Sequence, residues 1–314
     1  MIKDYKFSMD LKKVLVTGSA GLIGSFLVKQ LRNNYIEVIE LDKRLPTNKI
    51  GLANVQDANL LNQLIESCQG VVHLAAVSRV IWGEQNPDLC WGVNVQGTQN
   101  VLEAAYQAKQ KPWVIFASSR EVYGQQTILP VTEKADLMPL NTYAKSKVAG
   151  EKLVNQYRQL GLTTAILRFS SVYGSAYDHA DRVIPAFCRK AAQGEMLRVD
   201  GFNNLFDFTH VHDVVNGIIK AINKLQNNIS DLPPIHLTTG IGTSLLQVIG
   251  LIEQILNQSI DYKEAPARTY DVHSFCGDPC RAKSLLGWEA EISLMQGLSD
   301  LIKQYQTQIN CVTS

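Results

Sequence analysis

The chain has 314 residues, of which 46% are hydrophobic and 19% are charged, and its formal net charge is +1. A chain of this length can bury roughly three quarters of its unfolded surface, which suits one large domain or a domain with a smaller lobe. The basic residues are dispersed, which excludes an electrostatic nucleic-acid surface, and neither a signal-peptide core nor a run of about 18 apolar residues predicts export or a membrane span.

The N-terminal elements predict a phosphate-binding turn. Residues 1–11 read as a polar leader, and a short β-branched run, Lys12 to Thr17, then stops at the glycine-rich stretch Gly18–Gly24. An amphipathic segment, Leu22 to Leu31, follows. Strand, glycine turn and helix in this order place backbone N–H groups and a helix N-terminus where a pyrophosphate can bind.

A second strand-like run, Ile36 to Leu41, ends in Asp42, where a carboxylate is expected to bind an adenosine ribose diol. A carboxylate there repels a 2′-phosphate, so Asp42 predicts NAD rather than NADP. The adjacent Lys43 and Arg44 weaken this prediction without reversing it.

Further apolar runs at Gly70 to Leu74, Trp113 to Ser118 and Thr163 to Phe169 alternate with helical segments such as Val93 to Ala108. This alternation predicts an α/β fold with a parallel sheet covered on both faces. After Tyr173 the pattern is irregular, with helices expected at Val183–Gly194, His212–Leu225 and Ser244–Leu256.

Tyr143 and Lys147 are four residues apart, so a helix places them on one face, about one turn apart. A free phenol titrates near 10, but an ammonium about 5 Å away would contribute roughly 3 kcal/mol to the phenolate, or about two pKa units. The pair can therefore take a proton from an alcohol while a hydride leaves the same carbon.

Together these features resemble the extended short-chain dehydrogenases/reductases of the NAD-dependent epimerase/dehydratase family, which act on nucleotide sugars, and in particular its UDP-glucose 4-epimerase-like members. The resemblance runs from about Lys12 to about Tyr305. It rests on Thr17-Gly-Ser-Ala-Gly-Leu-Ile-Gly24, Val72-His-Leu-Ala-Ala76, Asn94-Val-Gln-Gly-Thr98, Ser118-Ser-Arg-Glu-Val-Tyr-Gly124, Tyr143-x-x-x-Lys147, Arg168-Phe-Ser-Ser-Val-Tyr-Gly174, Asp207-Phe-Thr-His-Val-His-Asp213 and Leu286-Gly-Trp288.

The resemblance implies a Rossmann-type, doubly wound parallel sheet with a smaller C-terminal α/β substrate lobe. Residues 12–173 would form the NAD-binding domain, and residues 174–314 would form mainly the lobe, with segments returning to the first domain. The residues expected to bind NAD are Gly18, Ala20, Gly21, Leu22, Ile23, Gly24, Asp42, Asn54, Val55, Leu74, Ala75, Ala76, Asn94, Tyr143 and Lys147. Asn54 stands where relatives often carry an Asp that bonds the adenine amino group, and its amide oxygen can accept the same bond.

The loop after Trp113–Ser118 matches the family's catalytic loop. Ser119 matches the catalytic Ser/Thr, whose hydroxyl bonds the reacting sugar oxygen. Glu121 matches a Glu common in members that abstract the C5 proton, but Arg120 replaces the Asp that usually protonates the leaving hydroxyl in 4,6-dehydratases. An arginine cannot supply that proton at neutral pH. Glu121 is therefore a base, a partner of Arg120 or a ligand of a substrate hydroxyl.

The substrate's phosphates should meet cations. Arg268, in Pro266-Ala-Arg-Thr-Tyr-Asp271, stands where the family has an arginine that grips the diphosphate. The chain has Phe206 where the family often has another arginine, and Ser171 where many relatives have an asparagine. Arg79 and Arg182 could compensate. The residues expected to bind substrate are Ser78, Arg79, Ser119, Arg120, Ser171, Arg182 and Arg268.

No metal site is expected. Cys276 and Cys280 have a four-residue spacing but no second Cys/His pair at zinc-finger spacing. His210 and His212 alternate along a strand-like segment and are expected to pack or to form hydrogen bonds. His73 belongs to a buried strand end and is not an expected base.

The sequence thus predicts an NAD-dependent nucleotide-sugar 4-epimerase. A cytoplasmic location is expected because six cysteines in a chain this long indicate free thiols in a reducing compartment. The runner-up is a dehydratase or decarboxylase that uses Glu121 at C5; a 4-ketoreductase is third, and a non-catalytic NAD sensor is disfavoured by Ser119, Tyr143 and Lys147. The expected partners are a UDP- or dTDP-linked sugar and a second copy of the chain, since many relatives dimerise through a four-helix bundle, with no nucleic acid and no membrane.

Overall fold

A computed structural model describes residues 11–45, 54–227, 232–268 and 270–313. Apart from Leu11, which is buried, the predicted polar leader lies outside the described residues.

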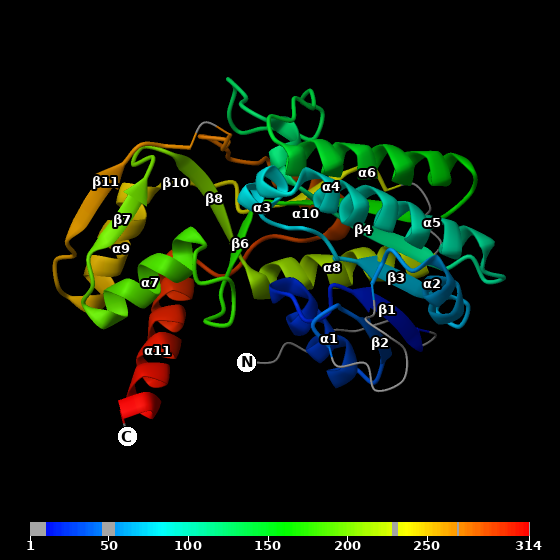
Figure 1. The fold of residues 1–314 in the computed structure, drawn as a ribbon, viewed down its shortest axis with the longest axis horizontal. Helices are drawn as coiled ribbons and strands as arrows, with labels where there is room; N and C mark the ends of the chain where they lie inside the picture. The colour runs from blue at the N-terminus through cyan, green and yellow to red at the C-terminus, as the bar shows by residue number, and fades with distance from the viewer. Residues whose placement is uncertain (1–10, 46–53, 228–231, 269, 314) are drawn as a thin grey trace.

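The centre of the molecule is a six-stranded parallel sheet in the order β2-β1-β3-β4-β5-β9 (Figure 1). The strands β1, β3, β4, β5 and β9 are buried along almost their whole length, the pattern of a parallel sheet covered on both faces, whereas the edge strand β2 is partly exposed. The chain leaves β1 to form β2 on one side and then crosses to form β3 on the other, which creates a switch point at the carboxyl ends of β1 and β3. The strands are β1 (Lys13–Thr17), β2 (Glu37–Leu41), β3 (Gly70–His73), β4 (Trp113–Ser119), β5 (Thr164–Phe169) and β9 (Ile235–Leu237).

Helices cover both faces of this sheet, which confirms the predicted doubly wound α/β class. One face carries α1 (Leu22–Asn33), α8 (Val211–Gln226) and α10 (Cys280–Leu286), and the other carries α2 (Ala58–Ile65), α5 (Gly97–Gln107) and α6 (Thr142–Gln159), as Figure 1 shows. The helix expected over Val93–Ala108 is in fact a π-helical turn, η1 (Gly92–Gln96), that continues into α5. It is preceded by α3 (Val80–Gln85) and α4 (Pro87–Trp91).

A smaller lobe has its own hydrophobic core beyond the carboxyl edge of the sheet. Three helices and two small sheets surround this core, on the left in Figure 1. The elements are β6 (Ser171–Tyr173), α7 (Val183–Gln193), β7 (Leu197–Asp200), β8 (Leu205–His210), β10 (Gly242–Ser244), α9 (Leu245–Leu256), β11 (Tyr262–Ala265) and α11 (Leu294–Thr313).

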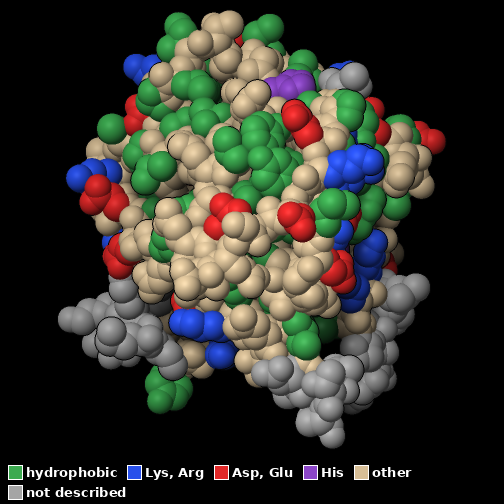
Figure 2. Space-filling model, turned by 90° about the vertical axis from the view of Figure 1, so that its left-hand side faces the viewer, with side chains coloured by type: hydrophobic (Ala, Val, Ile, Leu, Met, Phe, Trp, Pro, Cys, Tyr) green, Lys and Arg blue, Asp and Glu red, His purple; other side chains and the backbone are tan. Residues whose placement is uncertain are grey.

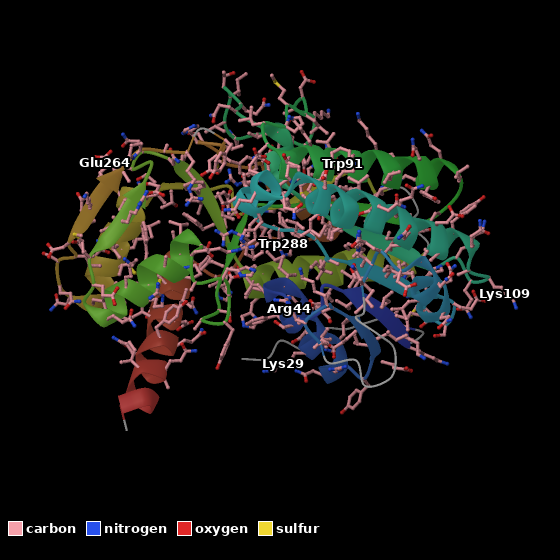
Figure 3. All side chains as sticks on the ribbon, viewed as in Figure 1. Lys29, Arg44, Trp91, Lys109, Glu264 and Trp288 are labelled. Atoms are coloured by element: carbon pink, nitrogen blue, oxygen red, sulfur yellow. The ribbon has the colours of Figure 1, made fainter. Side chains whose placement is uncertain are left out.

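The lobe's outer face, seen in Figure 2, carries Lys/Arg and Asp/Glu side chains interspersed by sign, together with apolar side chains that gather in its upper half. On the other side of the molecule, the Leu286-Gly-Trp288 motif fastens α10 to α8. Trp288 is fully buried and its Nε1 donates to the Asp213 carbonyl at 2.8 Å (Figure 3). The bond satisfies the indole N–H inside the core.

Candidate active site

A cavity of about 440 Å³ lies at the carboxyl edge of the central sheet and extends into the smaller lobe. One end is lined by the glycine turn after β1, and the other by β7, β8 and the loop that contains Arg268. The cavity therefore occupies the switch point, where open α/β sheets bind their ligands.

The glycine turn forms a cradle that side chains would fill. Gly18 has a φ of +70°, and a Cβ on it would lie 2.7 Å from the Ala75 nitrogen. A Cβ on Gly24 would lie 2.2 Å from the Gly18 oxygen, so both positions require glycine. Gly21 is the N-cap of α1 and offers no side-chain cap to the N–H groups of the first turn. These free donors at a helix N-terminus fit the pyrophosphate of NAD.

Asp42 follows β2 and is held by its neighbours. Its carboxylate accepts hydrogen bonds from the Ala20 nitrogen at 3.0 Å and from Nε and Nη2 of Arg44 at 3.0 and 2.9 Å. Burial raises the pKa of Asp42, but the hydrogen bonds and the charge of Arg44 outweigh it, so the pKa lies below its usual value. Asp42 is thus ionised at neutral pH, although the half-exposed Arg44 (Figure 3) already shares its oxygens.

We expect the cofactor-free enzyme to bind NAD(H) at least about tenfold more tightly than NADP(H), because a 2′-phosphate would face an ionised carboxylate. Fluorescence-quenching titrations of both cofactors measure the ratio. Asp42→Asn removes the charge and should narrow that ratio. Equal affinities in the unchanged enzyme would mean that Arg44 has turned to the phosphate, contrary to the prediction.

Most of the other expected cofactor residues border the cavity. Ala75 lies behind the lining, with its N–H donating to the Thr17 hydroxyl at 3.2 Å, and Val55 is buried against Gly97. Asn54 donates to the Gln56 side chain at 2.9 Å, and its role at the adenine stays a prediction. The expected cofactor residues that line the cavity are Gly18, Gly21, Leu22, Ile23, Gly24, Leu74, Ala76, Tyr143 and Lys147.

Asn94 has a different setting from the one expected. Its side chain is buried, accepts from the Val77 nitrogen at 2.7 Å and donates to the Ser146 hydroxyl at 2.9 Å. These bonds join the loop before α3 to α6 through Asn94. They occupy the amide on both sides, so any contact between Asn94 and the cofactor stays a prediction.

Tyr143 and Lys147 lie in the first two turns of α6, side by side in the cavity wall. The helix begins where the Asn141 side chain accepts from the Ala144 nitrogen at 2.8 Å. Both side chains are buried, and Lys147 Nζ donates to the Ala117 carbonyl at 2.8 Å. The ammonium lies 5.9 Å from the centre of the Tyr143 ring, close to the separation that the four-residue spacing predicts.

The expected depression of the Tyr143 pKa is wrong for this state of the protein. Burial raises the pKa of Tyr143 to about 12, and a hydrogen bond with Ser119 offsets only part of that rise. Burial also lowers the pKa of Lys147 to about 8. The prediction from the spacing considered the attraction between the two charges but not the loss of hydration, which is the largest cause of both shifts.

Ser119, Arg120 and Glu121 follow one another at the end of β4. Ser119 caps η2 (Arg120–Tyr123) by accepting from the Glu121 nitrogen at 3.2 Å. Glu121 Oε1 lies 2.9 Å from Arg120 Nη2, and Oε2 accepts from Asn141 Nδ2 at 3.2 Å. Of the three readings of Glu121, the partnership with Arg120 is therefore present in the structure.

The arginines expected at the diphosphate are already paired with carboxylates. Arg268 Nη2 lies 3.5 Å from Asp200, Arg182 Nε lies 3.6 Å from Asp178, and Arg79 pairs with Asp181. All three arginines line the cavity, as do Ser78 and Ser171. An entering diphosphate would compete with these carboxylates for the guanidinium groups.

The lobe contributes cavity residues that the sequence analysis did not predict to bind substrate: Arg198, Asp200, Asn204, Phe206 and Asp271. Asp271 is half-buried, and burial raises its pKa. The position of Asp271, three residues after Arg268, could have indicated this residue from the sequence. Phe206 was noted only because it replaces an arginine, and the other three follow no motif. The strands β7 and β8 and the turn between them place these four residues at the cavity.

His73 and His210 are buried, whereas His212 is exposed. His73 contacts the Thr17 and Thr98 hydroxyls, and burial lowers its pKa to about 3. His210 and His212 stack with ring centres 5.3 Å apart. They do not share a strand, however, because β8 ends at His210 and His212 lies in the first turn of α8.

Within the described residues, no His, Cys, Asp and Glu side chains gather as a group of three or more able to hold a metal ion. No helix in this part of the chain is long and apolar enough to cross a membrane.

Known proteins are similar to this chain in sequence and in fold. The model of the NAD dependent epimerase/dehydratase family matches residues 14–231. The chain is 32% identical over 303 residues to the putative UDP-glucose 4-epimerase of Methanocaldococcus jannaschii, across 92% of this chain and 97% of that protein. It is 27% identical to UDP-glucuronic acid decarboxylase 3 of Arabidopsis thaliana, across 98% and 93%. The solved structure of MoeE5 in complex with UDP-glucuronic acid and NAD is similar with a TM-score of 0.85 at 31% identity, across 94% of this chain and 99% of that one.

Proposed function

The chain belongs to the NAD-dependent epimerase/dehydratase family and is an NAD-dependent enzyme, and from this premise we propose that it is a nucleotide-sugar 4-epimerase. It oxidises the sugar at C4, lets the 4-keto sugar turn over in the pocket, and reduces it from the other face. The observation that carries the proposal is the meeting of Ser119, Tyr143 and Lys147 in one cavity that joins the glycine cradle to the lobe.

In this mechanism Tyr143 takes the proton from the C4 hydroxyl, and Ser119 holds the same oxygen. The Ser119 side chain lies close enough to the phenol to lower its pKa, so both groups can bond the same sugar oxygen. Lys147 would hold the nicotinamide ribose, and its positive charge beside the Tyr143 ring favours the phenolate, which is the form that takes the proton. NAD, when bound, supplies the acceptor and donor of hydride. On the return step Tyr143 gives its proton back to the C4 oxygen.

The setting of Glu121 supports epimerisation over chemistry at C5. Both of its oxygens are engaged, one by Arg120 and the other by Asn141. A C5 base would have to leave these donors to reach a C–H bond. Arg120 has no proton to give a leaving hydroxyl at neutral pH, which disfavours elimination of water.

We therefore expect no deuterium on carbon in the product when the reaction runs in D₂O. An epimerase returns hydride to C4 and never breaks the C5–H bond, whereas a dehydratase or decarboxylase exposes C5 or C6 to solvent protons. The substrate is found first by incubating the enzyme with a panel of UDP- and dTDP-sugars and reading the products by mass and proton NMR. The same two measurements then locate any label.

Glu121→Gln should lower kcat by less than about tenfold, because the amide oxygen still accepts a hydrogen bond from Arg120. Deuterium at C5 or C6, together with a nearly inactive Gln variant, would make Glu121 the base and establish the dehydratase or decarboxylase. The observation that favours this second function is the buried carboxylate of Glu121 in the cavity wall. A ketoreductase would show net oxidation of NADH in the same assay.

The two halves of the chain divide the work in this proposal: residues 12–173 bind NAD, and residues 174–314 supply mainly the substrate lobe. The substrate is a UDP- or dTDP-linked sugar.

Five described cysteines are free thiols, which supports a reducing, cytoplasmic location. Trp82 on α3 and Leu89 and Trp91 on α4 are exposed (Trp91 is labelled in Figure 3), which supports a homodimer joined through helices.

A further inference from the structure

Arg120 has hydrogen-bonding capacity that the protein does not use. Its Nη2 is paired with Glu121, whereas Nη1 is buried and has no hydrogen-bond partner among the described residues. The side chain is only 11% exposed and borders the cavity. A guanidinium can only donate, so whatever completes this group is an acceptor. A buried donor without an acceptor is unfavourable, and a ligand that accepts from it gains that difference.

The guanidinium is held in position from several sides. Its carbon lies 5.1 Å from the centre of the Phe206 ring and 5.8 Å from that of Phe275. Glu121 is itself tied to Asn141, which caps the helix that carries Tyr143. Arg120 therefore holds one charged donor, Nη1, in a fixed position, and a charge-assisted hydrogen bond from it is stronger to a carboxylate than to a neutral hydroxyl.

The place of Arg120 next to Ser119 indicates which part of the sugar Arg120 meets. Arg120 directly follows Ser119, which hydrogen-bonds with Tyr143 at the reacting oxygen of the proposed mechanism. The groups closest to Arg120 are thus the substituents next to C4. On a hexose, the adjacent carbon that can carry a carboxylate is C5, through its C6 group.

We propose that Arg120 binds a carboxylate on C5, so that the substrate is a nucleotide-linked hexuronic acid. The inference rests on the proposed epimerisation, because Ser119 and Tyr143 orient the sugar. Arg120 bridges two carboxylates, that of Glu121 and that of the substrate. It is a specificity-determining residue and takes no part in moving protons.

The kinetic test compares UDP-glucuronate with UDP-glucose on the NAD-loaded enzyme. We expect kcat/KM for the uronate to exceed that for UDP-glucose at least about tenfold. Arg120→Met should lower the uronate value by roughly 30- to 100-fold, as expected for the loss of a charge-assisted hydrogen bond, and change the UDP-glucose value by less than about threefold. Arg120→Lys keeps the charge but not the planar guanidinium, so it should recover part of the lost kcat/KM for the uronate.

Arg198→Met is the matched control, since Arg198 also lines the cavity but is largely exposed and pairs with Asp200. It should leave the ratio of the two kcat/KM values unchanged. Thermal unfolding of each variant checks that the fold is retained, and Arg120→Lys carries the test if Arg120→Met unfolds.

Calorimetric titration separates this inference from the proposed reaction. UDP, UDP-glucose and UDP-glucuronate are titrated into the NAD-loaded enzyme, and Arg120→Met should weaken binding of the uronate alone. Equal weakening of all three ligands would place Arg120 on the shared diphosphate and overturn the inference, as would a wild-type preference for UDP-glucose. Uronate binding that depends on Arg120 without any epimerised product would keep the inference and reject the epimerase.

Discussion

Tyr143→Phe should lower kcat by at least about 10², and by as much as about 10⁴, because it removes the proposed proton acceptor. The change deletes one oxygen from a buried ring and leaves the packing around it intact. The protonated phenol is strongly favoured in the protein without its ligands, since burial holds the pKa of Tyr143 at about 12. Only the phenolate can take the C4 proton, so the phenol must first lose its own proton to solvent when cofactor and substrate are bound, and phenylalanine has no oxygen that could replace it.

Tyr157→Phe provides the matched control on the same helix. Tyr157 is also buried, but its hydroxyl bonds Glu103 away from the cavity. Its loss should change kcat by less than about twofold, since no reacting group depends on it. Initial rates with saturating substrate, with NAD content checked by absorbance, make the comparison. Near-normal turnover in Tyr143→Phe would show that the chemistry lies elsewhere.

Lys147→Met should lower kcat/KM by at least about 10² and weaken NAD by at least about tenfold, because one ammonium serves both the cofactor and the phenol. The methionine keeps most of the apolar stem, so packing against Phe116 is largely preserved. Lys145→Met is the control: Lys145 lies on the same helix but is exposed. Its activity and NAD affinity should stay close to those of the unchanged enzyme.

The affinity for NAD should also depend on pH through Lys147. Its pKa in the protein is about 8, so the charged form that binds the ribose is lost as the pH rises through that value. We expect the Kd for NAD to be constant below about pH 7 and to increase above about pH 8, and to lose this dependence in Lys147→Met. A pH-independent Kd in the unchanged enzyme would contradict the assignment. Fluorescence titrations across this range measure it.

The same shift has a separate effect on stability. The pKa of Lys147 falls from 10.5 to about 8 on folding, so between these values the unfolded chain binds more protons. This group's contribution to stability therefore rises with pH across that window, and burying the ammonium is unfavourable below it. Lys147→Met removes this unfavourable burial of an ammonium and should not lower the melting temperature at pH 7. A loss of activity in this variant is then distinguished from a loss of folding.

Local features of this protein could be predicted from the sequence because bonded geometry and short-range periodicity determine them. The strand runs at Lys13–Thr17 and Trp113–Ser119 are continuous apolar segments, and such segments form buried parallel strands wherever helices can cover them. The cradle follows from glycines that no side chain can replace at Gly18 and Gly24. The pairing of Tyr143 with Lys147 follows from the helical repeat alone.

Only the tertiary structure decided which charges meet. Arg268 pairs with Asp200 on β7, and Glu121 shares its oxygens between Arg120 and Asn141. Apart from that of Arg120 with Glu121, these contacts join segments far apart in the chain, and no spacing encodes them. The pKa of Tyr143 also depended on the fold, since it reflects how much water the assembled walls exclude from the phenol. Sequence thus determined the reactive groups and their local geometry, whereas burial and long-range packing, which depend on the whole chain, decided their ionisation and their partners.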